Sequence, residues 1–242
     1  GVMDIDATST FETTQSFLVT AKGTMNIAGK ATVAGTLTNN GAINMIDKAA
    51  TLTSSECGNV TTNVADHKVV YANGTYKVVA KKYVAIIDEN RKFETFKEAL
   101  DVIQNGETIT LVADDYTEGK ESGEIDFVRD IEFTITGKST KYALPVVTFK
   151  NATVNIQNAE ILIPELDARQ DATINIKSST VHDAGGNSIA KSYYNGTINI
   201  DANSTVHMMQ VTTMGYINVA GTLNATWQTN VYGNGIITLA EG

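Results

Sequence analysis

Cysteine and proline are almost absent from this chain of 242 residues, which contains one cysteine and two prolines. The single Cys57 excludes an intrachain disulfide, so cysteine usage gives no indication of an oxidising compartment. The three histidines, His67, His182 and His207, have no metal-ligand spacing to Cys57 or to one another. We therefore expect no metal and no other cofactor.

Basic residues are also in the minority, with 18 lysines and arginines against 27 aspartates and glutamates. The resulting net charge of −9 argues against nucleic acid or an anionic membrane surface as a partner, because both need a basic footprint. No apolar run is long enough to span a bilayer, so we expect no membrane insertion within this chain.

A short phrase that repeats about every twenty residues is the main feature of the sequence. Each copy alternates apolar and small or polar residues with period two, as a short half-buried strand does. Stacked at a regular spacing, such strands join their apolar pairs into one core and predict a parallel β-solenoid. The copies are Thr24–Ile27, Ala42–Met45, Thr153–Ile156, Thr173–Ile176, Thr197–Ile200 and Tyr216–Val219.

An antiparallel sandwich is the alternative architecture, because its strands also alternate with regular turns. It requires a hairpin signal every eight to twelve residues, and Asn-Gly pairs such as Asn73-Gly74 are too sparse for that. We therefore predict an all-β, parallel β-helix, right-handed because parallel crossovers almost always are.

One helix interrupts the strand pattern. Thr95 and Glu98 form a capping box, and Asn105-Gly106 supplies a stop signal. The apolar face comprises Phe96, Ala99, Leu100 and Ile103. A helix over residues 95–104 would cover the open end of a solenoid, where strand edges otherwise recruit other chains. We predict a short solenoid-like unit over residues 1–80 and a helix-capped β-helix over residues 81–242.

The stretch FETFKEALDVIQNGETITLVADD resembles the phrase that opens right-handed β-helix modules in bacterial cell-surface proteins. The matching residues are Phe93, Thr95, Phe96, Glu98, Ala99, Gly106, Glu107, Thr108, Ile109, Leu111 and Asp114. The later repeats are similar to coils of pectin-lyase-like and adhesin-type β-helices. This resemblance implies the fold and a secreted, surface-attached setting within a longer protein, but no enzyme activity, because function resides in sites rather than in folds.

Asp167, Arg169 and Asp171 are the strongest candidate site residues. If this segment is extended, alternation places all three side chains on one face. Such a row could bind sugar hydroxyls, hold a calcium ion or act as acid and base. The alternative, which we favour, is a solvated turn whose charges compensate one another.

Aromatic residues gather in the C-terminal coils, among them Tyr193, Tyr194 and Trp227. On an outer face they would form a platform for pyranose rings. The alternative, which we favour, is that they fill wide coils or plug the end of the solenoid.

These observations favour a non-enzymatic structural or adhesive module of a bacterial surface protein, with extracellular glycans or a host surface as possible partners. The alternative is a polysaccharide lyase or glycoside hydrolase that uses carboxylates along a solenoid groove. A further alternative is a ligand- or ice-binding face built from the outward Thr-x-Asn rows, although Ala42 and Tyr216 interrupt these rows.

Overall fold

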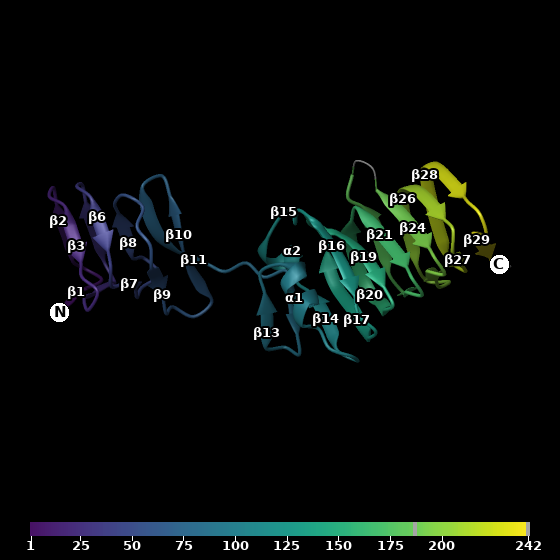
Figure 1. Cartoon of the computed structure of the whole chain (residues 1–242), viewed down its shortest axis with the longest axis horizontal. Coiled ribbons are helices and arrows are strands. Elements are labelled where there is room, and N and C mark those ends of the chain that lie inside the picture. Colours follow the sequence, from purple (N-terminus) through teal and green to yellow (C-terminus); the bar gives the residue numbers. More distant parts are fainter. Residues whose placement is uncertain (186–187, 241–242) are drawn as a thin grey trace. The chain divides into compact units, whose positions relative to one another are not determined.

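The structure is a computed structural model that describes residues 1–185 and 188–240. It divides into two compact units, Gly1–Lys81 and Lys82–Gly242, each a stack of short, mostly parallel strands (Figure 1). The predicted fold class, an all-β solenoid with a short helix, is confirmed. The boundary between the units lies at Lys81 and Lys82.

The first unit contains three parallel stacks that run from coil to coil. The strands β1, β4, β7 and β9 form one sheet, β2, β5 and β8 lie in a second, and β3 pairs with β6. These strands are Val2–Ile5, Thr10–Thr13, Phe17–Val19, Thr24–Ile27, Lys30–Val33, Leu37–Asn39, Ala42–Met45, Thr51–Thr53 and Val60–Thr62 for β1 to β9.

An antiparallel hairpin closes the second sheet of the first unit. Its strands β10 (His67–Ala72) and β11 (Thr75–Ala80) pair with each other, and β11 pairs antiparallel with β8. Asn73 and Gly74 form the turn, both at positive φ, of 50° and 75°. This is the backbone that a two-residue hairpin turn requires. The Asn73-Gly74 signal therefore does mark a hairpin, at the end of a parallel stack.

The second unit begins with antiparallel strands and continues as a parallel stack. The antiparallel strands are β12 (Ala85–Ile87) and β13 (Arg91–Phe93), and β12 also pairs with β14. The following strands are β14 Thr108–Leu111, β15 Gly119–Lys120, β16 Glu124–Val128, β17 Glu132–Ser139, β18 Tyr142–Ala143, β19 Val146–Lys150, β20 Thr153–Ile163, β21 Glu165–Arg169, β22 Thr173–Lys177, β23 Thr180–Asp183, β24 Ile189–Tyr193, β25 Thr197–Ile200, β26 Thr205–Thr213, β27 Tyr216–Val219, β28 Thr222–Val231 and β29 Ile236–Leu239.

Several long strands of the second unit turn a corner and join two faces of the coil. The first half of β20 pairs with β22 and its second half with β23. A register shift marks this corner between β17 and β20, next to Gly137. Gly137 has a φ of 85°, and an added Cβ would lie 2.4 Å from the carbonyl oxygen of Leu111. Glycine is therefore required there by both backbone conformation and space.

The helix α1 spans Phe96–Val102, and the predicted capping box is present. Thr95 Oγ1 accepts a hydrogen bond from the Glu98 amide, and Glu98 accepts from the Thr95 amide. The helix ends one turn before Asn105-Gly106, because the backbone of Ile103 already leaves helical conformation at a ψ of 140°. A single-turn helix, α2, follows at Ala113–Tyr116.

The core of the second unit extends from α1 into the stacked coils. Phe96, Ala99, Leu100 and Ile103 are buried in the same cluster as the inward strand residues. The predicted ladder is confirmed, because its rungs are in register and all its side chains are buried: Ile174, Ile198 and Ile217 in one row, and Ile176, Ile200 and Val219 in the next. Burying each such side chain stabilises the fold by roughly 1.5–3 kcal/mol.

Candidate functional site

The outward asparagines of the repeat form side-chain ladders that link successive coils. In the first unit Asn26 Nδ2 donates to Asp4 Oδ1 at 2.7 Å, and Asn44 Nδ2 donates to Asn26 Oδ1 at 2.9 Å. Thr61 Oγ1 continues the row by donating to Asn44 Oδ1 at 3.1 Å. Each amide thus uses its donor toward the preceding coil and its acceptor toward the next.

The second unit repeats this arrangement over four asparagines. The row starts where Asn155 Nδ2 donates to Glu132 Oε1 at 2.8 Å. Asn175, Asn199 and Asn218 then each donate to the preceding asparagine at 3.1, 2.8 and 2.8 Å. A carboxylate accepts the first bond in both units. The outward half of the repeat therefore holds the coils together.

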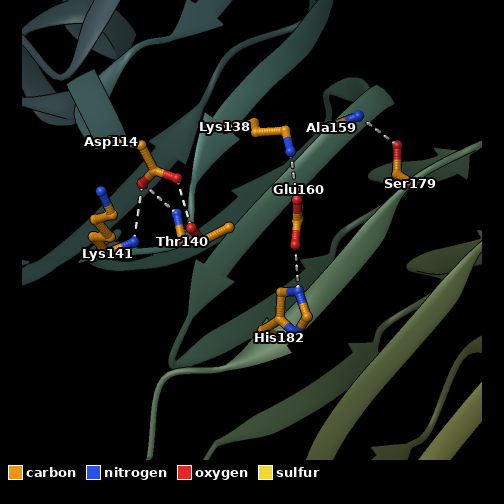
Figure 2. A network of polar contacts seen from close by, with 8 residues as sticks. All are labelled: Asp114, Lys138, Thr140, Lys141, Ala159, Glu160, Ser179 and His182. Carbon is orange, nitrogen blue, oxygen red and sulfur yellow. Dashed lines mark hydrogen bonds and ion pairs between the residues drawn. The ribbon is translucent and has the colours of Figure 1, made fainter.

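A second polar network of the second unit also runs from coil to coil (Figure 2). Glu160 accepts from Lys138 Nζ at 2.9 Å and lies 3.2 Å from His182 Nε2. The hydrogen bond from Lys138, followed by the contact with His182, lowers the pKa of Glu160. The His182 ring stacks on His207 with centroids 6.0 Å apart, and Asn224 Nδ2 lies 3.1 Å from His207 Nδ1.

Asp114 belongs to the same region and fixes a turn (Figure 2). Its carboxylate accepts from the Thr140 amide at 2.6 Å, from Thr140 Oγ1 at 2.5 Å and from the Lys141 amide at 2.9 Å. Partial burial opposes ionisation, but these hydrogen bonds outweigh it and lower the pKa of Asp114. Both networks stabilise the fold, because one links successive coils and the other holds a turn in place.

A charged groove of about 450 Å³ lies on the second unit, over the sheet face formed by β16, β19, β21 and β24. The strands β16, β19, β21 and β24 run parallel beneath it. Their register aligns one row of Asp126, Thr148, Asp167 and Lys191, and a neighbouring row of Val128, Lys150, Arg169 and Tyr193. The lining residues are Glu124, Ile125, Asp126, Val146, Thr148, Lys150, Glu165, Arg169 and Lys191.

Asp167 is fully buried at this face, although its strand neighbours on the same side are the groove residues Glu165 and Arg169. Its Oδ2 accepts from Arg169 Nε at 2.8 Å and from Thr148 Oγ1 at 3.3 Å, and it lies 2.6 Å from Arg169 Nη2. Its Oδ1 is buried and has no hydrogen-bond partner among the described residues. Buried polar atoms are nearly always paired, so this oxygen needs an explanation.

Glu165 is the acidic neighbour of Asp167 in this groove. Its Oε2 lies 2.7 Å from Lys191 Nζ, and its carboxyl group is within hydrogen-bonding reach of Asp167. Burial raises the pKa of Glu165, the lysine opposes the rise, and the charge of Asp167 adds to it. Two carboxyl groups in contact, of which one resists ionisation, are typical of a pair that holds a proton.

The structure separates the predicted row of Asp167, Arg169 and Asp171. Strand β21 ends at Arg169, and Gln170 and Asp171 form a turn with φ values of 50° and 64°. Asp171 therefore does not continue the strand face, so the condition for a single face of three side chains, an extended segment through Asp171, is not met. The favoured solvated turn fits Asp171, but it is wrong for the buried Asp167.

The predicted aromatic residues lie in different environments. Tyr193 is half-buried, and its ring packs against the guanidinium of Arg169 at 5.3 Å, next to the groove. Tyr194 and Trp227 are each 67% exposed, so they neither fill the core nor line this groove. Filling of wide coils is therefore wrong for Tyr194 and Trp227, whereas the other part of that alternative, that aromatic residues plug the end of the solenoid, stays a prediction.

Sequence reasoning missed Glu165, Lys191, Lys150 and Asp126 as groove residues. The signal was present, because short alternating segments with polar or charged residues two positions apart recur in 124–128, 148–150, 165–169 and 191–193. Aligning these segments by coil, rather than reading each alone, would have placed them side by side.

The described residues include no group of three or more histidine, cysteine, aspartate or glutamate side chains that could hold a metal ion. No helix in residues 1–185 and 188–240 is long and apolar enough to cross a membrane. In comparisons with known proteins, no family model, no curated protein and no solved structure matches the chain.

Proposed function

We propose that the chain is a non-enzymatic structural module of a secreted surface protein. The observation that carries this proposal is the pair of asparagine ladders, which join successive coils by direct side-chain hydrogen bonds in both units. In a solenoid each coil contacts only its neighbours, so such rows add to each coil interface that they cross. Outward side chains used in this way favour a scaffold role.

The secreted, surface-attached setting and the longer parent protein are part of this proposal. They are supported by the resemblance of residues 93–115 to the opening phrase of surface β-helix modules. An adhesive role adds a contact with extracellular glycans.

We assign the glycan contact to the charged groove of the second unit. Sugar hydroxyls both donate and accept hydrogen bonds, and the groove offers carboxylates and cations side by side. Thr148 contributes a hydroxyl, and Tyr193 extends the surface beside Arg169. A site with few convergent polar groups on a rigid sheet is suited to orient such a ligand.

Cleavage of a glycan has weaker support at this groove. A glycosidase places two carboxyl groups on opposite sides of the bond that it breaks. Glu165 and Asp167 come from the same strand, point to the same side and contact each other. In addition, Lys191 and Arg169 pair with them. The pair is therefore poorly placed to flank a glycosidic oxygen.

The test is binding of the full chain to an array of neutral and acidic glycans, compared with the Lys150→Gln variant. Lys150 lines the groove and, among the described residues, forms an ion pair with the exposed Asp126 alone, so its loss removes a contact without orphaning a buried charge. We expect weak, reversible binding that falls about tenfold in Lys150→Gln, near the lower end of the value of one charge-assisted hydrogen bond.

The matched control is Lys97→Gln, which removes an equally paired lysine from α1. It should bind like the unchanged chain. Absence of binding to every glycan would overturn the glycan contact. Binding that Lys150→Gln leaves unchanged would overturn the groove as its location.

A further inference from the structure

The carboxylate oxygen Oδ1 of Asp167 is buried and has no hydrogen-bond donor among the described residues. All three donors to Asp167 converge on Oδ2, whereas Glu165 lies within hydrogen-bonding reach and has no hydrogen to give when it is ionised. A proton on Glu165 would provide the missing donor, because a protonated carboxyl group is a donor.

We propose that Glu165 and Asp167 share one proton, and that the groove is a proton-linked binding site for neutral, hydroxyl-rich saccharides. In the closed state the protonated Glu165 donates to Oδ1 of Asp167. In the open state Glu165 is ionised and its side chain turns away, which uncovers the buried Oδ1 of Asp167, and a ligand hydroxyl donates to that oxygen in its place. The ligand part of this inference rests on the proposed glycan contact.

The charges around the pair support one bound proton. The other charged groups that line the groove are Glu124 and Asp126 on β16, Lys150 on β19, Arg169 on β21 and Lys191 on β24. With Glu165 and Asp167 included, three cations face four carboxyl groups. Full ionisation leaves one negative charge in excess, and one proton removes it. Burial and the adjacent Asp167 charge also raise the pKa of Glu165 above its ordinary value of 4.5.

The same charges select the class of ligand. An anionic sugar must compete with carboxylates that already pair with Lys150, Arg169 and Lys191. An ammonium group would approach Arg169 and Lys191 at close range and be repelled. A neutral hydroxyl carries a donor without charge, so it replaces the proton of Glu165 with the smallest electrostatic cost.

The proton and the ligand therefore compete, which fixes the direction of the pH dependence. Binding is weak where Glu165 is protonated and strengthens as the pH rises through the pKa of Glu165, above 4.5. By linkage, the ligand must lower that pKa. At a ligand concentration about ten times Kd, the midpoint of the Glu165 titration falls by about one pH unit.

The first measurement is carbon NMR of the side-chain carboxyl groups in the full chain, with Glu165 assigned by its loss in Glu165→Gln. We expect Glu165 to titrate above 4.5 and cellohexaose to lower its midpoint. Mannohexaose tests the same effect with another neutral backbone. A Glu165 midpoint at or below 4.5 without ligand overturns proton sharing, whatever the result of the glycan array.

The second measurement is cellohexaose and mannohexaose binding across pH by Glu165→Gln. Its amide is a permanent donor to Asp167, so this variant should bind about tenfold more weakly at neutral pH and lose the pH dependence. Glu160→Gln makes the same chemical change outside the groove and should keep both.

The outcomes separate this inference from the function on which it rests. Array binding without any pH dependence, or unchanged in Glu165→Gln, overturns the proton-linked site and leaves the glycan contact standing. Array binding to acidic glycans alone overturns the neutral ligand class.

Discussion

The two units use the same stacking rule but close their ends differently. Both place apolar side chains inward and an asparagine row outward, and both rows begin on a carboxylate, Asp4 or Glu132. The first unit closes one sheet with the hairpin β10–β11, whereas the second begins with α1 and the antiparallel β12 and β13. The repeat therefore determines the stack, and separate local signals determine the caps.

Buried charge is the second difference. Asp167, in the second unit, is the one fully buried charged side chain among the described residues. Arg169 compensates Oδ2 of this carboxylate, but the buried Oδ1 has no partner among the described residues, which makes Asp167 a candidate for a role beyond packing. The comparison predicts that changes to the repeat act within one unit, and that changes to the groove act on binding.

The largest effect is expected from Ile198→Asp, which places a charge in the inward ladder of the second unit. Ile198 is 1% exposed and stacks between Ile174 and Ile217. The free energy of unfolding of this unit should fall by about 4 kcal/mol or more. Hydrogen exchange read by mass spectrometry should show loss of protection in the second unit alone.

The control for this prediction is Thr197→Asp, one residue earlier on the outward side of the same strand. It should cost at most about 1 kcal/mol. Equal effects of the two variants would show that the inward and outward faces are assigned wrongly.

A smaller effect is expected from Leu100→Ala in the cap of the second unit. Leu100 is 1% exposed, and the cavity left by its truncation should cost about 3 kcal/mol. Thermal unfolding of the second unit should shift, while the first unit keeps its own cap, the β10–β11 hairpin. A shift shared equally by both units would contradict separate caps.

The hydrogen bonds of the asparagine ladder should contribute less to the stability of the second unit. The cost of a variant should be proportional to the number of bonds that it removes. Asn199 donates to Asn175 and accepts from Asn218, so Asn199→Ala should destabilise the second unit by about 2 kcal/mol. Asn218→Ala removes one bond and should cost about 1 kcal/mol. Denaturant unfolding measures both losses of free energy, and the slope of free energy against denaturant concentration should be unchanged. Equal costs of the two variants would contradict stabilisation in proportion to the number of ladder bonds.

The smallest effect is expected from Asp114→Asn, which should change how stability depends on acidic pH. The pKa of Asp114 is lowered in the folded state, so its contribution to stability is present above its ordinary pKa of 3.8 and is lost as the pH falls through the folded value. Asp114→Asn should therefore be less stable at neutral pH but show a shallower loss of stability in acid. Melting curves from pH 7 down to pH 2 measure it, and parallel curves for both proteins would contradict it.

Periodicity was sufficient to predict the stack from the sequence. The rows through Ile174 and Ile176 follow from period-two alternation, and the Thr95–Glu98 capping box follows from local spacing. The alternation and the capping box each lie within a few residues, and the recurrence of the phrase about every twenty residues can be read from the sequence directly.

The candidate site could not be predicted in the same way, because it depends on pairs that lie far apart in sequence. Lys191 meets Glu165 from 26 residues away, and Thr148 meets Asp167 from 19. Whether Asp167 is buried depends on those neighbours, while Asp171, with the same charge, sits in a turn. Local sequence alone does not distinguish the two aspartates.

The most direct test of a non-enzymatic scaffold with a glycan-contacting groove is a single incubation that reads binding and turnover together. The full chain is mixed with pectins, alginates, glycosaminoglycans, mucin glycans and neutral polysaccharides, with and without calcium. Retention of the protein is measured alongside new reducing ends and unsaturated products. We predict reversible binding to the neutral polysaccharides with no products. Products that disappear in Asp167→Ala or Glu165→Gln, but persist in Asp171→Ala, would contradict the account and establish a lyase or hydrolase in the groove.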